Sequence, residues 1–245
     1  MFPADVRAVV IDGVIEPISW STGRGAQYET LPVDARLHSE DGAYATLQQF
    51  LTLCDDGGDR CAFSAGDLRR RYRRIAHQLR EDPVRLPGGG RVTYNSLVST
   101  TLGAMYGPGS WRSLAQLPAG PGRGVAAGPG GRRLHAVRAA VADIGAVSGR
   151  PTRGRGTSQV FEGFYGVTCS ETDNPATSEA WADAAAAADR CSPYSGRTWI
   201  WGSSICALWP AVDEDRFTGP YSPETAHSVL VVGTGSTRPP GTRTR

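Results

Sequence analysis

The pattern of hydrophobic and polar positions predicts one β-strand near each end of the chain and mostly helices between them. Residues 6–11 (Val-Arg-Ala-Val-Val-Ile) and 229–232 (Val-Leu-Val-Val) are short, β-branched and almost uninterrupted apolar runs. Such runs are typical of strands buried on both faces of a parallel sheet. More than 200 residues separate them, far more than a single crossover helix requires. We therefore expect two neighbouring strands with a large insertion between them.

Helical spacing of apolar residues predicts helices over much of the insertion. The clearest one begins after Ser64, the expected N-cap, and ends at Asp82-Pro83, because the residue before a proline disfavours helix. Further helices are predicted over residues 41–53, 92–106, 134–147 and 179–190, the last of them capped by Ser178.

The helix before Asp82 has a basic face made of Arg69, Arg70, Arg71, Arg73 and Arg74. One interpretation is a nucleic-acid patch, and the other is a solvated face that borders an acidic loop. We favour the solvated face, because no further basic and aromatic residues join the patch. The net charge of +2 gives no general electrostatic reason for nucleic acid or membrane binding. We expect neither partner.

Composition indicates a loop-rich protein. The apolar fraction is 40%, with 31 Gly and 17 Pro, and residues 118–133 are low-complexity Gly/Pro/Arg sequence that we expect to be disordered or a linker. All 26 basic residues are Arg, which we attribute to a genome rich in G and C. No apolar stretch reaches membrane-spanning length, and no signal peptide opens the chain.

Five cysteines are present. Cys54 and Cys61 flank a short loop that a disulfide could close, and the others are Cys169, Cys191 and Cys206. No CxxC pair or Cys/His cluster has zinc spacing, so we expect no metal and no cofactor. Paired cysteines without a signal sequence are explained if the chain is a fragment of a secreted protein.

Five blocks of the sequence stand out in order along the chain: residues 1–14, 104–115, 169–175, 206–210 and 229–233. They resemble, in turn, the strand after a nucleophile elbow, a Leu-Tyr…Pro…Trp…Leu-Ala cap segment, a Cys-x-Asp block, a Cys-x-x-Trp-Pro block and the strand that leads to a catalytic acid. The ordered set is similar to that of the tripeptidyl aminopeptidase and prolyl aminopeptidase-like serine peptidases of the α/β-hydrolase fold.

The resemblance implies an incomplete α/β-hydrolase fold in which two parallel core strands flank a largely helical cap. Residues 1–20 would be a piece of the hydrolase core, residues 21–222 the cap, and residues 223–234 the second core strand. Residues 235–245 would be a disordered tail, because a frameshift near Thr234 would replace the family's Asp-Pro-Ala-Thr motif.

The family's reaction is acyl transfer by a Ser, His and Asp triad with an oxyanion hole. This sequence contains no G-x-S-x-G motif, and the acid and histidine expected by resemblance are also missing. The resemblance therefore implies a fragment of a secreted aminopeptidase that releases tripeptides or N-terminal residues from peptides. The chain by itself would be inactive. The alternative function is a stand-alone cap-like module that binds peptides or a partner without catalysis, and a separately encoded upstream fragment is a possible partner.

The resemblance also implies roles for particular residues. Glu171 and Asp173 would bind the ammonium group of the substrate, the alternative being a polar turn that caps the next helix. The expected disulfides are Cys54–Cys61 and Cys169–Cys206, with Cys191 unpaired.

Several other candidates have a plainer explanation. Asp12 suits a turn, and Ser203 lacks the second glycine of a nucleophile elbow. The tryptophans at 199, 201 and 209 suit core packing better than a pocket wall. The histidines at 38, 77, 135 and 227 are scattered along the chain, so we expect them to be surface residues and not general bases.

Overall fold

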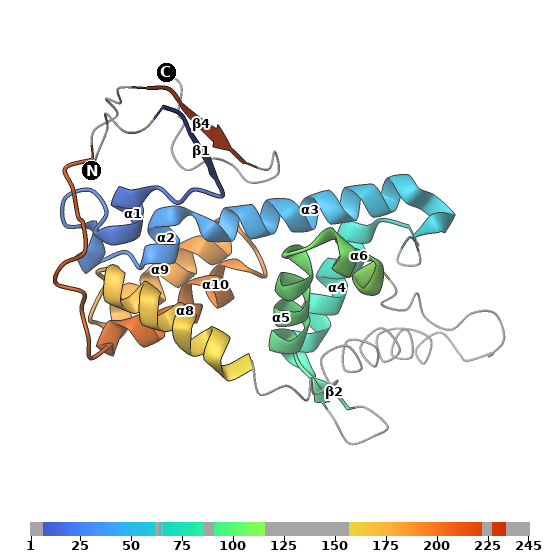
Figure 1. Ribbon diagram of the computed structural model, residues 1–245. Helices are drawn as coiled ribbons and strands as arrows, with labels where there is room; N and C mark the ends of the chain where they lie inside the picture. Colours follow the sequence, from blue (N-terminus) through green and yellow to red (C-terminus); the bar gives the residue numbers. More distant parts are fainter. Residues whose placement is uncertain are drawn as a thin grey trace, which may run out of the picture. The chain divides into compact units, whose positions relative to one another are not determined.

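The computed structural model describes residues 7–61, 64, 66–85, 91–115, 157–221 and 227–233. The chain forms two compact units. Unit 1 consists of residues 1–42 and 155–245, and unit 2 of residues 43–154. The predictions for residues 118–133, 134–147 and 235–245 lie outside the described residues. Figure 1 shows the elements, which are mainly helices.

Unit 1 contains a parallel strand pair followed by short helices. Its elements are β1 (Val9–Asp12), α1 (Pro17–Ser21), the 3-10 helix η2 (Gln27–Glu29), α2 (Val33–Leu37), α8 (Thr157–Glu171), α9 (Ser178–Cys191), α10 (Gly196–Gly202), the 3-10 helix η4 (Ser204–Leu208) and β4 (Val229–Val232). Helix α3 (Ser39–Gly57) begins in unit 1 and continues into unit 2.

The strands at the two ends of the chain pair with each other in parallel. Val9 lies opposite Val229 and Asp12 opposite Val232, and the Gly13 N–H donates to the Val232 carbonyl oxygen over 3.3 Å. The predicted neighbouring strands are confirmed (Figure 1). A helix-rich chain with one parallel strand pair is compatible with the α/β class.

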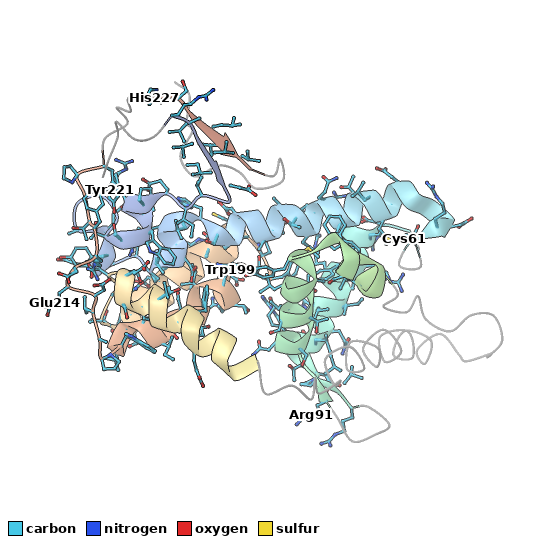
Figure 2. All side chains as sticks on the ribbon, in the orientation of Figure 1. Cys61, Arg91, Trp199, Glu214, Tyr221 and His227 are labelled. Atoms are coloured by element: carbon cyan, nitrogen blue, oxygen red, sulfur yellow. A yellow bond between two sulfur atoms is a disulfide. The ribbon has the colours of Figure 1, made fainter. Side chains whose placement is uncertain are left out.

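The burial expected for these strands on both faces is not found among the described residues. Val10 is 65% exposed, Leu230 60% and Val231 55%, and side chains stand out from the strand pair in Figure 2. The apolar runs reflect strands that need cover on two faces, and two strands alone cannot cover one another's faces. The apolar faces of the two strands are thus left exposed in the part of the chain that the structure describes.

The core of unit 1 is built on α9 and α10. Trp181, Ala185 and Ile200 are almost fully buried, and alanines on α9 bring α10 close to it. The Trp181 indole N–H donates to the Pro175 carbonyl oxygen over 2.8 Å, which satisfies its one polar group. Helix α9 begins at Ser178 and not at residue 179, so its N-cap is Thr177, whose hydroxyl accepts from the Ala180 N–H.

Unit 2 is a small helical assembly with its own core. Its elements are the greater part of α3, the 3-10 helix η3 (Gly58–Arg60), α4 (Leu68–Glu81), β2 (Val84–Arg85), β3 (Arg91–Val92), α5 (Tyr94–Met105) and α6 (Pro108–Ala115). The predicted apolar face of α3 is buried at Leu47, Phe50 and Leu51. Tyr72 on α4 and Thr101 on α5 share a buried hydrogen bond of 2.9 Å between their hydroxyls.

Two helix starts in unit 2 differ from the prediction. The N-cap of α4 is Asp67, which accepts from the Arg70 N–H, and not Ser64. Helix α5 begins at Tyr94 and not at residue 92, because β3 pairs with β2 in antiparallel register. Thr93 and Ser96 then form a capping box, which satisfies N–H groups that the helix leaves without a partner.

The expected disulfides are confirmed. Cys54 is bonded to Cys61, just beyond the C-terminal end of α3 (Figure 2), and Cys169 to Cys206. Cys191 is a free, exposed thiol. Closing loops of these lengths stabilises a fold by about 2–4 kcal/mol in the chain-entropy description, and such bonds persist in oxidising compartments. Among the described residues no helix is long and apolar enough to cross a membrane.

Gly196→Ala tests the close approach of α10 to α9. A Cβ at position 196 would meet the Ala188 carbonyl carbon and oxygen of α9 at 2.4 Å, and backbone atoms cannot yield as a flexible side chain can. We expect the free energy of unfolding to fall by about 3 kcal/mol in urea titrations. Gly202→Ala is the control, because a Cβ there meets nothing within 4 Å. Equal stability of the two variants would contradict this packing.

Candidate functional site

The candidate site of unit 1 is the segment formed by the C-terminal end of α8, with Glu171, and the residues that follow it, with Asp173. It is held by hydrogen bonds to the first helices of the chain. The Trp20 indole N–H donates to the Glu171 carboxylate over 3.0 Å, and the Asp173 N–H donates to the Ser21 carbonyl oxygen over 2.8 Å. The Val33 N–H, at the start of α2, donates to the Asn174 side-chain oxygen over 2.9 Å. The fold therefore joins two segments about 150 residues apart in sequence.

Asp173 is engaged in an ion pair. Its carboxylate accepts from the Arg216 guanidinium over 2.5 Å, and the two side chains are 30% and 15% exposed. Arg216 also donates to the Ser170 carbonyl oxygen over 3.2 Å. Arg216 belongs to the polar loop after η4. In the same loop, the Asp213 N–H donates to the Ser170 carbonyl oxygen. The negative charge of Asp173 is therefore largely neutralised within the protein.

Glu171 differs from Asp173 in having no cationic partner among the described residues. Its side chain is half-buried, and the indole N–H of Trp20 is a neutral donor that orients one carboxylate oxygen. The carboxylate of Glu171 is therefore not paired with a cation in the described part of the chain. Of the two predicted ammonium-binding residues, the structure brings both to one segment but leaves one charged group uncompensated.

Arg36 on α2 holds the backbone around this segment. Its side chain is 6% exposed and donates to four carbonyl oxygens, over 2.6 Å to Leu31, 2.8 Å to Ser19, 3.2 Å to Trp20 and 3.3 Å to Ser21. Burial lowers the pKa of Arg36 to about 10, against the opposing charges of Asp173 and Asp34. The guanidinium is still charged at neutral pH and links α1 to α2.

A second polar group of unit 1 consists of the carboxylates of Asp34, Glu40 and Asp41. Asp34 accepts from the Ser203 hydroxyl over 2.5 Å, and Asp41 accepts from the Ser192 hydroxyl over 2.6 Å. Glu40 is 5% exposed, and its Oε2 atom has no hydrogen-bond partner in the part of the chain that the structure describes. These contacts tie α2 and the start of α3 to α9 and α10.

Burial, together with the smaller effect of the nearby charges of Asp41 and Asp34, raises the pKa of Glu40 to about 7. Burial also raises the pKa of Asp34, although hydrogen bonds from Ser203 and Trp199 oppose that shift. The carboxyl group of Glu40 is thus an acid that can hold its proton close to neutral pH.

The residues His38, Glu40 and Asp41 are the one set in the described ranges whose potential ligand atoms lie within 4.8 Å of one another. A cation there is disfavoured by its position. The set lies at the N-terminus of α3, the positive end of the helix dipole, and Asp41 is already bonded to Ser192. The geometry gives no reason to place a metal at this set.

The remaining candidates lie apart from the Glu171 segment. Ser203 is buried against Asp34. His38 faces Asp41 over 3.9 Å and His77 faces Glu81 over 3.5 Å. Asp12 is exposed at the end of β1. Ser204 begins η4, His227 precedes β4, and His135 lies outside the described residues.

The tryptophans of α10 contact core and polar groups. Trp201 stacks on the buried Trp181 with ring centroids 6.4 Å apart. It is itself 38% exposed, so the prediction of core packing was wrong for this residue. Trp199, labelled in Figure 2, lies next to Asp34 as a hydrogen-bond donor. Trp209, after η4, is half-buried.

Sequence reasoning missed the roles of Arg36, Arg216 and Glu40. Arg216 follows three consecutive acidic residues, and an arginine in such a loop could have been suspected of an ion pair. No sequence signal distinguishes Arg36 or Glu40 from the exposed charges of other helices, because their burial arises from α2 and α3 packing against distant segments.

No protein-family model matches the chain. Among curated proteins it is similar to "Carboxylesterase B" of Mycobacterium tuberculosis (strains H37Rv and CDC 1551) and to "Putative hydrolase Mb2247c" of Mycobacterium bovis. Each is 27% identical over 240 residues, which is 95% of this chain and 41% of the relative. The similarity supports a hydrolase family for this chain. The chain spans about two-fifths of the length of the relatives that it matches.

Glu40→Gln tests the buried carboxyl group through the pH dependence of stability. The pKa of Glu40 lies near 7 in the folded state and at the ordinary value of 4.5 in the unfolded state. Between these pH values the folded state binds more protons than the unfolded state. The wild type therefore loses stability as the pH rises from 4.5 to 7. We expect Glu40→Gln to match the wild type near pH 4.5. Above pH 7 its free energy of unfolding should be larger by at most about 3 kcal/mol.

Urea titrations across this pH range measure the difference, with Glu214→Gln as the control. Glu214 is exposed and lies outside the buried group (Figure 2), so its variant should follow the wild type at every pH. A constant offset between Glu40→Gln and the wild type would count against a raised pKa.

Proposed function

We propose that this chain is the cap-bearing part of a secreted serine aminopeptidase of the α/β-hydrolase fold. The observation that carries the proposal is the parallel register of β1 with β4 around a long insertion that is mainly helical. The hydrolase relatives support the general class. The two disulfides support an oxidising, extracellular location.

In this proposal the chain supplies substrate binding and not the reacting groups. Acyl transfer needs a nucleophilic serine, a histidine, an acid that orients it and an oxyanion hole. The 245 residues contain no G-x-S-x-G motif, so the chain by itself is inactive. In the family that the sequence resembles, the serine precedes the strand matched by β1, and the acid and histidine follow the strand matched by β4. We therefore propose that other segments supply these groups and add strands at the edges of the β1–β4 pair.

Glu171 is the residue proposed to bind the substrate's ammonium group. It has an uncompensated charge, and the Trp20 indole orients it. Its unit is also acidic: residues 1–42 and 155–245 contain 17 Asp and Glu against 10 Arg. A negative field of this kind attracts a cation. A charge-assisted hydrogen bond at a fixed position would determine how far from the N-terminus the substrate is cleaved.

Reconstitution tests the proposal. We expect the isolated chain to hydrolyse neither esters nor amides above background. Co-expression with segments that contain the family's G-x-S-x-G motif, acid and histidine should produce cleavage of a tripeptidyl chromogenic substrate. Hydrolysis by the isolated chain that one serine substitution abolishes would overturn the proposal. An inactive co-expressed complex, together with peptide-dependent thermal stabilisation of the isolated chain, would favour the alternative of a binding module.

Glu171→Gln in the reconstituted enzyme tests the ammonium site. Loss of one charge-assisted hydrogen bond, about 1.5–3 kcal/mol, corresponds to a rise in KM of about 10- to 100-fold for a substrate with a free α-amino group. An N-acetylated substrate should be unaffected. Asp173→Asn is the matched control: it breaks the ion pair with Arg216 and should lower stability without discriminating between the two substrates. Equal discrimination by both variants would sink the assignment to Glu171.

A further inference from the structure

Charge is distributed unequally between the two units of the chain. Residues 43–154 contain 16 Arg and 7 Asp and Glu, so unit 2 has a net charge of +9. Unit 1, with 10 Arg and 17 acidic residues, has a net charge of −7. The chain's net charge of +2 therefore conceals one strongly basic unit, and an expectation based on the total charge does not apply to that unit.

Helix α4 displays part of this charge on one face. Leu68, Tyr72, Ile75, Ala76 and Leu79 are buried and line one side of the helix. Positions 70, 73 and 74 lie on the opposite side, because each residue turns the helix by about 100°. Arg70, Arg73 and Arg74 are exposed, and we call them the arginine face. Packing of the apolar side determines the direction in which these three residues point.

Among the described residues, the arginine face lacks the side-chain contacts that its neighbours make. Arg69 donates to the side chains of Gln48 and Thr52, and Arg80 packs over the Tyr94 ring. The side chains of the arginine face make no ion pair or hydrogen bond with the residues described here. The pKa of Arg71 is lowered mainly by burial and further by the positive charge of Arg74. These like charges repel one another, and an external anion would relieve that repulsion.

The chemistry of the face indicates which anion it fits. Within the described part of unit 2, the large apolar side chains that are exposed are Leu53 and Tyr106, and neither belongs to α4. A protein partner would normally be anchored by buried aromatic or aliphatic groups, and single-stranded nucleic acid by stacking on aromatic rings. A laterally uniform anionic surface requires neither. Guanidinium groups bind phosphate oxygens in a bidentate manner.

We propose that the arginine face docks the chain peripherally on an anionic phospholipid bilayer. The Cys54–Cys61 disulfide in the same unit indicates an oxidising compartment, where bilayer surfaces are available and nucleic acids are scarce. The apolar side of α4 is occupied by the core of unit 2, so the helix lies on the headgroups and does not insert. This proposal is independent of the proposed hydrolase function, because it uses no residue of the Glu171 segment.

Vesicle co-sedimentation of the full chain tests the proposal. We expect binding to vesicles of phosphatidylcholine mixed with phosphatidylglycerol, no binding to pure phosphatidylcholine, and loss of binding at high salt. Each arginine near an anionic surface contributes about fivefold to partitioning, so R70Q/R73Q/R74Q should bind about 100-fold more weakly. Glutamine has a helix propensity close to that of arginine, so the variant should keep the thermal melting profile of the wild type.

Two further variants separate charge from other effects. R70K/R73K/R74K keeps the positive charges and should retain most of the binding. R24Q/R190Q/R197Q removes three exposed arginines of unit 1 and should bind as the wild type does. The proposal is overturned if the wild type ignores phosphatidylglycerol at low salt, or if R70Q/R73Q/R74Q binds equally well. Tighter binding to duplex DNA or to polyglutamate than to vesicles, at the same salt, would also overturn it.

Discussion

The backbone pairing of β1 with β4 is the constraint on which the organisation of this chain depends. Because residues 9–12 and 229–232 lie side by side in parallel register, every described helix between them lies in the connection that leaves one strand and returns to the other. Parallel strands cannot be joined by a tight turn, so a long excursion is required. The same pairing leaves valine, isoleucine and leucine side chains exposed on the strands. An isolated parallel pair has too little hydrophobic cover to be stable alone, which is why the proposed function places further strands against it.

Unit 1 is organised by buried charge as much as by apolar packing. Arg36 connects the ends of α1 and the start of α2 through four carbonyl oxygens, and Asp173 and Arg216 pair beside them. Buried charges are tolerated when they are paired and hydrogen-bonded. Arg36 and Asp173 meet that requirement. Glu40 does not meet it, and the pKa of its buried carboxyl group is raised instead. Glu171 keeps its charge uncompensated at the edge of this network, and a ligand with a positive group would complete it.

The two units differ in the kind of contact that they offer to other molecules. Unit 1 is acidic and contains the ordered carboxylate segment, whereas unit 2 is basic and presents the arginine face. A total charge near zero arises here from two large opposite contributions. The hydrolase relatives, at 27% identity over 95% of the chain, support a hydrolase family for the chain as a whole. The arginine face of unit 2 follows from the burial pattern of α4. It does not depend on the similarity to those relatives.

The local sequence predicted those elements whose apolar residues recur at a regular spacing. The faces of α3 and α4, the two short apolar runs that become β1 and β4, and the disulfides expected by resemblance all agree with the structure. Helix starts were less predictable, since Asp67, Thr93 and Thr177 became caps through the path of the preceding backbone. Tertiary structure alone decided which charges are buried. Arg36, Glu40 and Asp173 look like ordinary surface residues in the sequence. Only the contacts between separate segments determine that Arg36 and Asp173 are paired and that Glu40 is buried. The spacing of apolar residues predicts which face of a helix is buried. Contacts between distant segments decide which groups pack against that face.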